Sequence, residues 1–97
     1  METLGARVVI VDDEPMVLQS LRSFLTLETD YDIETFDDPA KALEAAKSSS
    51  VDLIMTDYLM PGINGIEFLL EMKKIHPYAT RILLTGYADK ENAIKAI

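Results

Sequence analysis

The chain has no cysteine and fewer basic than acidic residues, and each shortage argues against particular kinds of binding site or partner. Without cysteine there is no disulfide and no thiolate metal site. Nine Lys and Arg against seventeen Asp and Glu give a formal net charge of -8. That balance disfavours nucleic acid as a direct partner, because phosphate binding needs clustered positive charge. No apolar run approaches the length of a membrane span, and residues 1–4 lack the basic-then-apolar layout of a signal peptide. We therefore expect a cytoplasmic protein with no membrane contact.

What is present is the composition of one globular domain. The chain has 97 residues, 48% of them hydrophobic and 27% charged. This length fits a single domain over residues 1–97 and is too short for two. Short apolar runs alternate with amphipathic stretches, which is the pattern of βαβ units around a parallel sheet. The predicted fold class is α/β.

This alternation predicts four strands and four helices. The strands are expected at Arg7–Val11, Tyr31–Phe36, Leu53–Thr56 and Arg81–Thr85, and the helices at Met16–Leu27, Ala40–Ser48, Ile66–Ile75 and Lys90–Ile97. The strand at Tyr31–Phe36 alternates apolar with acidic residues, which predicts an edge position. Pro15 suits the first turn of a helix, and Asp37-Asp38-Pro39 reads as a helix cap.

Two smaller expectations concern side-chain exposure. The first helix has one apolar stripe at helical spacing, made of Val17, Leu18, Leu21, Phe24 and Leu25. His76 precedes Pro77 at a helix end, where a solvent-exposed His near the helix dipole is expected.

Acidic residues follow two of the apolar strands. Asp12 and Asp13 come after the first strand, and Asp57 comes after the third. Parallel sheets place their sites beyond the carboxyl ends of their strands, so neighbouring strands would bring the three carboxylates together. Taken singly, each Asp is also what caps and turns use. Together they could not stay ionised without a cation, which argues for a divalent metal, and carboxylate oxygens suit Mg²⁺.

Such a cluster can also do chemistry. A carboxylate such as Asp57 can attack a phosphoryl group to form an acyl phosphate, a reaction that needs Mg²⁺ to neutralise the combined charge. Thr85 ends the fourth predicted strand, and its hydroxyl could donate a hydrogen bond to a phosphoryl oxygen. Gly86 beside it leaves room for the group to enter.

Three segments, Val8–Pro15, Asp52–Gly65 and Ile82–Gly86, together resemble the receiver domain of bacterial response regulators. The resemblance covers essentially the whole chain. It implies a flavodoxin-like, doubly wound parallel sheet. The expected strand order is 2-1-3-4, with the family's fifth strand and fifth helix missing.

The resemblance also implies roles for the matching residues. Asp57 would be the phosphoacceptor, taking its phosphoryl group from a sensor histidine kinase or a phosphotransfer protein. Asp13 would bind Mg²⁺ directly with Asp12 in support, and Asp57 and the backbone carbonyl of Leu59 would complete the protein ligands. Thr85 would be the switch hydroxyl. The domain would control an output domain in the parent chain, as a self-phosphorylating switch rather than a turnover enzyme.

The chain departs from the family pattern at its end. The family's Lys and aromatic switch residue, both on the fifth strand, have no counterpart here. Lys90–Ile97 stops without Gly, Pro or a basic cap, which predicts a fragment of a longer protein. The apolar strand Arg81–Thr85 would then be a bare edge, which predicts a homodimer through that edge.

Two other functions are considered. One is a phosphatase with an aspartyl nucleophile, but such enzymes use Asp-x-Asp after the first strand, and Asp12-Asp13-Glu14 lacks the second Asp. The other is a protein-binding or dimerisation module without phosphotransfer.

Overall fold

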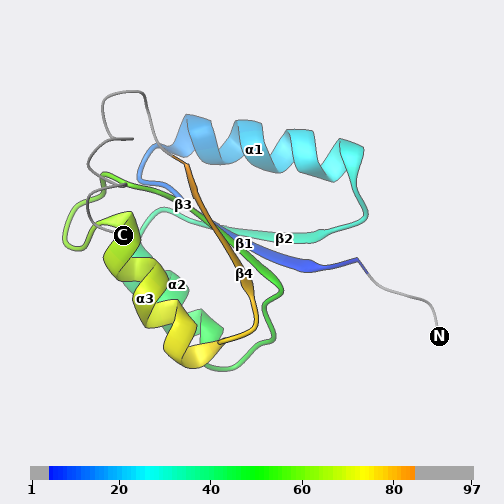
Figure 1. Cartoon of the computed structure of the whole chain (residues 1–97). Helices are drawn as coiled ribbons and strands as arrows, with labels where there is room; N and C mark the ends of the chain where they lie inside the picture. The colour runs from blue at the N-terminus through cyan, green and yellow to red at the C-terminus, as the bar shows by residue number, and fades with distance from the viewer. Residues whose placement is uncertain (1–4, 85–97) are drawn as a thin grey trace.

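The computed structural model describes residues 5–84, which form a four-stranded parallel sheet with helices on both faces (Figure 1). The strands are β1 (Arg7–Val11), β2 (Asp32–Phe36), β3 (Leu53–Asp57) and β4 (Thr80–Leu84), and the helices are α1 (Pro15–Glu28), α2 (Pro39–Ala46) and α3 (Gly65–Ile75). The strand order is β2-β1-β3-β4. It confirms the predicted fold class, the order 2-1-3-4 and the edge position of β2. The helix predicted at Lys90–Ile97 lies outside the described residues.

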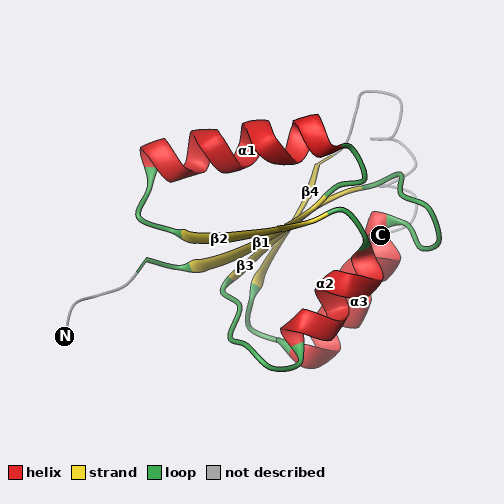
Figure 2. Ribbon diagram, turned by 180° about the vertical axis from the view of Figure 1, so that it is seen from behind, coloured by secondary structure: helices red, strands yellow, loops and turns green. Residues whose placement is uncertain are grey.

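The sheet divides the interior into two apolar layers. Helix α1 covers one face, and α2 and α3 cover the other (Figure 2). Successive strand side chains point to opposite faces, so Val8 and Ile10 pack with Leu18 of α1, whereas Val9 and Val11 join the core under α2 and α3. Strand β1 is buried on both faces, which explains its unbroken apolar run.

Local chemistry sets the start of each helix. Pro15 occupies the first turn of α1, where its missing N–H costs nothing. The Asp38 carboxylate caps α2 by accepting the Ala40 N–H at 3.0 Å. Helix α3 begins with a capping box in which Asn64 and Glu67 exchange side-chain to backbone hydrogen bonds, each 2.9 Å long.

Two exposure predictions were wrong. Phe24 is 62% exposed, because α1 rests on the sheet through Leu18, with Leu21 and Leu25 packed beside it. His76 is half-buried, and its Nε2 lies 2.8 Å from the Ala46 carbonyl oxygen. The cause is that α2 and α3 lie side by side, which brings the His76 ring to the carboxyl end of α2. Among the described residues no helix is long and apolar enough to cross a membrane.

Candidate functional site

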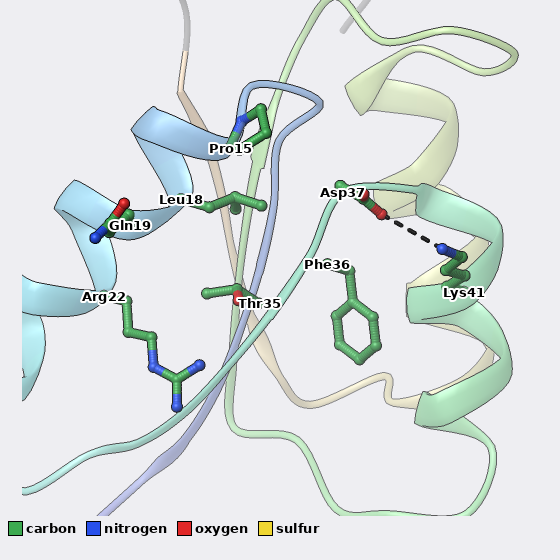
Figure 3. Close-up of a pocket in the computed structure, with 8 residues that line it drawn as sticks. All are labelled: Pro15, Leu18, Gln19, Arg22, Thr35, Phe36, Asp37 and Lys41. Atoms are coloured by element: carbon green, nitrogen blue, oxygen red, sulfur yellow. Dashed lines mark ion pairs between the residues drawn. The ribbon is translucent and has the colours of Figure 1, made fainter.

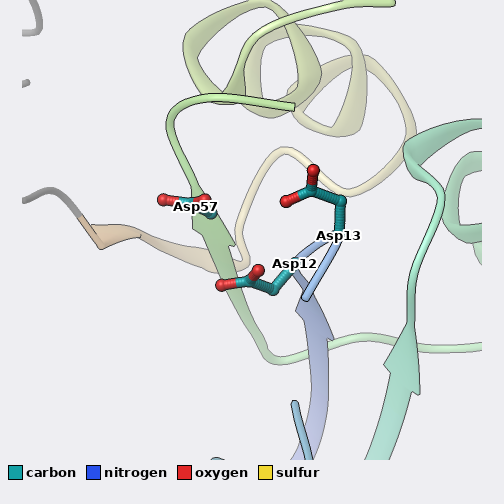
Figure 4. A group of neighbouring side chains, drawn as sticks. All are labelled: Asp12, Asp13 and Asp57. Carbon is teal, nitrogen blue, oxygen red and sulfur yellow. The ribbon is translucent and has the colours of Figure 1, made fainter. Parts of the chain in front are cut away.

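The three acidic side chains predicted to converge lie together at the carboxyl ends of β1 and β3 (Figure 4). Val11 pairs with Thr56 across these two neighbouring strands, so the residues that follow, Asp12 and Asp57, leave the sheet at the same edge. One carboxylate oxygen from each of Asp12, Asp13 and Asp57 lies within 4.8 Å of the others. Three acidic groups therefore share one small space.

Asp12 is the buried member of the cluster, with 4% of its surface exposed. Burial raises the pKa of its carboxyl above the ordinary value, and the nearby charges of Asp13 and Glu14 raise it further. The Glu14 N–H opposes this shift by donating to Asp12 Oδ1 at 2.9 Å. A cation placed among the carboxylates would favour the ionised form of Asp12.

Asp13 and Asp57 are the accessible members. Asp13 is exposed, and it does not cap α1, whose N-cap residue is Glu14. Asp57 is half-buried at the last position of β3, and its Oδ1 accepts the Tyr58 N–H at 2.9 Å. None of the Lys and Arg side chains described forms an ion pair with Asp12 or Asp13. Three carboxylate oxygens gathered this closely are the kind of ligand set that suits a divalent ion such as Mg²⁺.

The backbone after Asp57 is held close to the start of α3. The Gly65 N–H donates to the Tyr58 carbonyl at 2.8 Å. A Cβ atom at Gly65 would lie only 2.3 Å from the Asp57 carbonyl oxygen. Glycine is therefore required here by close backbone approach, and it lets α3 pack against the end of β3.

Thr56 is a residue of the site that the sequence reasoning missed. It is completely buried, and its hydroxyl donates to the Asp57 carbonyl at 2.9 Å and lies 3.6 Å from Met60 Sδ. These contacts join the strand end to the loop that follows it. The available signal was a polar residue at an inward position of an otherwise apolar strand, because a buried hydroxyl needs a partner.

The structure says little about the roles predicted for Leu59 and Thr85. Leu59 lies in the loop after β3 with its side chain 59% exposed, so the side chain contributes little to the core. Its expected role concerns only its backbone carbonyl. Thr85 lies outside the described residues, one position beyond β4.

Comparison with known proteins places this chain in a family. Residues 8–97 match the response regulator receiver domain. The chain is 34% identical over 97 residues to the hydrogenase transcriptional regulatory protein HoxA of Cupriavidus necator, covering all of this chain and 20% of HoxA. It is 32% identical over 89 residues to the DNA-binding transcriptional regulator NtrC of Escherichia coli, covering 92% of this chain and 19% of NtrC. The chain thus spans about a fifth of the length of these relatives.

A solved structure has a similar fold. The response regulator TrrA of Thermotoga maritima, in complex with Mg²⁺ and BeF, matches with a TM-score of 0.81 and 35% identity, over 94% of this chain and 78% of that chain. The family match extends over nearly the whole sequence, and the parallel sheet has the expected strand order. The chain belongs to the receiver domain family of two-component response regulators.

Proposed function

We propose that this domain, over residues 1–97, is a phosphorylation-controlled switch in which Asp57 accepts a phosphoryl group from a histidine kinase or a phosphotransfer protein. The convergence of Asp12, Asp13 and Asp57 at the ends of β1 and β3 supports this most strongly. Only Asp57 of the three both ends a strand and stays half-exposed, as an attacking group must.

In the proposed step an Asp57 carboxylate oxygen attacks phosphorus of a phosphohistidine. The new P–O bond forms as the P–N bond breaks, and the departing imidazole keeps the bonding electrons and takes up a proton. The Tyr58 N–H, which donates to Asp57 Oδ1 at 2.9 Å, restricts the rotation of the carboxylate and so holds it in one orientation for attack.

Mg²⁺ is the metal proposed for the acidic cluster, held by Asp13, Asp57 and the Leu59 backbone carbonyl with Asp12 in support. When bound, it supplies positive charge to offset the carboxylates and the incoming phosphoryl oxygens. Asp12 contributes a buried carboxylate, and burial raises its pKa. Binding of the metal ion is therefore coupled to loss of the Asp12 proton. Thr85 is proposed as the hydroxyl that responds to the phosphoryl group.

The proposal has consequences for partners. The domain acts on an output domain of a longer chain, in the cytoplasm, and does not itself turn over a substrate. Relatives such as NtrC are named as DNA-binding regulators, and here DNA contact is assigned to an output domain. The net charge of -8 fits this assignment of DNA contact to another domain, because negative charge opposes binding to the phosphates of DNA.

The test is modification of the full chain by acetyl phosphate with Mg²⁺, followed by intact mass measurement. We expect the mass increase of one phosphoryl group in the wild type and none in Asp57→Asn. Asp30→Asn is the control for a carboxylate outside the site, because Asp30 is exposed and lies at the opposite end of the sheet, before β2. Equal modification of wild type and Asp57→Asn would reject Asp57 as acceptor.

A second candidate function is self-association through β4, with no phosphotransfer. Among residues 5–84, β4 pairs with β3 on one side only, and Ile82 on it is 37% exposed. An apolar edge of this kind favours pairing with a second copy, most simply in a two-fold dimer. Light scattering across a concentration series tests it, and a monomer at the highest concentration would exclude this arrangement.

A further inference from the structure

A hollow that none of the three acidic side chains lines lies over the outer edge of β2 (Figure 3). It has a volume of about 540 Å³, within the range of ligand sites. Gln19 and Arg22 of α1 form one wall, and Lys41 of α2 lies on the other. Thr35 and Phe36 of β2 lie between the two walls. The two helices thus flank an edge strand, leaving a slot open to solvent.

The floor of this slot is the outer edge of β2, where backbone N–H and C=O groups point away from the sheet. The Asp32 amide and the Phe36 carbonyl both form hydrogen bonds on the β1 side of the strand. In a parallel ladder alternate residues share a side, so Ile33 and Thr35 direct their N–H and C=O groups away from β1. No described strand lies on that side. An extended peptide could therefore add to β2 by backbone pairing.

The walls carry more donors than acceptors. Among residues 5–84, neither the Arg22 guanidinium, the Gln19 amide nor the Thr35 hydroxyl has a hydrogen-bond partner, and Arg22 has no ion pair. Lys41 pairs with Asp37 at 3.7 Å, with both groups well exposed, so the pair is weak. The lining thus holds two cationic side chains, Arg22 and Lys41, and one carboxylate, Asp37, which is an unusual balance in a chain with nine basic and seventeen acidic residues.

We propose that the β2 slot, defined by Arg22, Lys41 and the outer edge of β2, binds an extended acidic segment of a partner protein. Successive side chains of a strand point to opposite sides. Two consecutive acidic residues would therefore reach both walls, one meeting Arg22 and the next meeting Lys41. The apolar surfaces of Leu18 and Phe36 favour β-branched residues on either side of the acidic pair.

The probe is a fluorescein-labelled peptide, Thr-Val-Glu-Glu-Val-Thr, titrated with the full chain and followed by fluorescence anisotropy at low salt. We expect saturable binding that Arg22→Gln and Lys41→Gln each weaken about threefold, the size of an exposed charge pair. Raising the salt concentration should weaken it further. Lys47→Gln is the matched control, because this exposed Lys follows the far end of α2 and pairs with Glu44.

Two modified peptides separate the contributions. The Gln-Gln analogue should bind more weakly, and a peptide N-methylated at the residues that pair with β2 should not bind. No saturable binding of the Glu-Glu peptide, or equal binding of the Gln-Gln analogue, would overturn the proposal. A dimer of the chain that dissociates in Arg22→Gln would assign the slot to a second copy instead. Because the slot lies outside the acidic cluster, Asp57→Asn should bind the peptide as the wild type does, whatever becomes of phosphotransfer.

Discussion

Replacing Gly65 by Ala is the sharpest test of how the site is built. The added Cβ would lie 2.3 Å from the Asp57 carbonyl oxygen, 2.8 Å from Leu83 Cδ1 and 3.0 Å from the Tyr58 Cα. Leu83 could rotate away, but the other two atoms belong to the backbone. The start of α3 must therefore move away from the end of β3, or Asp57 must move.

The magnitude follows from two opposing effects. Overpacking of this kind costs about 1–3 kcal/mol. Ala is a better helix former than Gly by up to ~1 kcal/mol, and Gly65 is the first residue of α3. We expect a net loss of about 2 kcal/mol in the free energy of unfolding, because a backbone contact at 2.3 Å places the cost at the upper end of the range.

The assay is urea denaturation followed by circular dichroism, with Gly62→Ala as the matched glycine control. Gly62 has no atom within 4 Å of an added Cβ, but its φ is +91°. Its replacement should cost about 1–2 kcal/mol through backbone strain, with no displacement of Asp57. Phosphorylation by acetyl phosphate should then slow on the order of tenfold in Gly65→Ala, since a misplacement of about 1 Å can cost up to ~100-fold. A Gly65→Ala protein as stable as the wild type would refute this account of the packing.

Three further predictions follow from the same contacts. Burial raises the folded-state pKa of Asp12 above its unfolded value, so the folded state binds this proton more tightly and stability falls as pH rises from the unfolded pKa through the folded one. Asp12→Asn should therefore stabilise the metal-free protein at neutral pH and lose that advantage in acid, as seen in urea melts across pH. Thr56→Val should cost about 1 kcal/mol in the same melts by removing the hydroxyl bound to Asp57. Thr56→Ser keeps that hydroxyl but loses a buried methyl group, so it should also cost about 1 kcal/mol. Asn64→Ala removes the cap of α3 and should cost about 1 kcal/mol, while a Glu67→Gln control, which keeps a side-chain acceptor, should change stability little.

The close agreement between predicted and observed elements has a local cause. The cap at Asp38 and the start of α1 at Pro15 depend only on residues that are neighbours in the sequence, so both could be predicted from it. The positions of Asp12, Asp13 and Asp57 at the ends of strands could be predicted for the same reason. Phe24 and His76 were misjudged because their exposure depends on which elements pack beside them, and helical periodicity carries no such information.

The sequence by itself determined where the strands and helices form, and that Asp12, Asp13 and Asp57 stand at strand ends. Those features depend on side-chain alternation, helical spacing and turn chemistry within a few residues. Only the tertiary structure decided that the three carboxylates share a space of a few ångströms, that Asp12 is buried, and that Gly65 meets the Asp57 carbonyl. These depend on β1 lying beside β3 and on α3 packing at the end of β3, which are contacts between segments far apart in the chain. The same strand order leaves β2 at the edge and so creates the slot between α1 and α2.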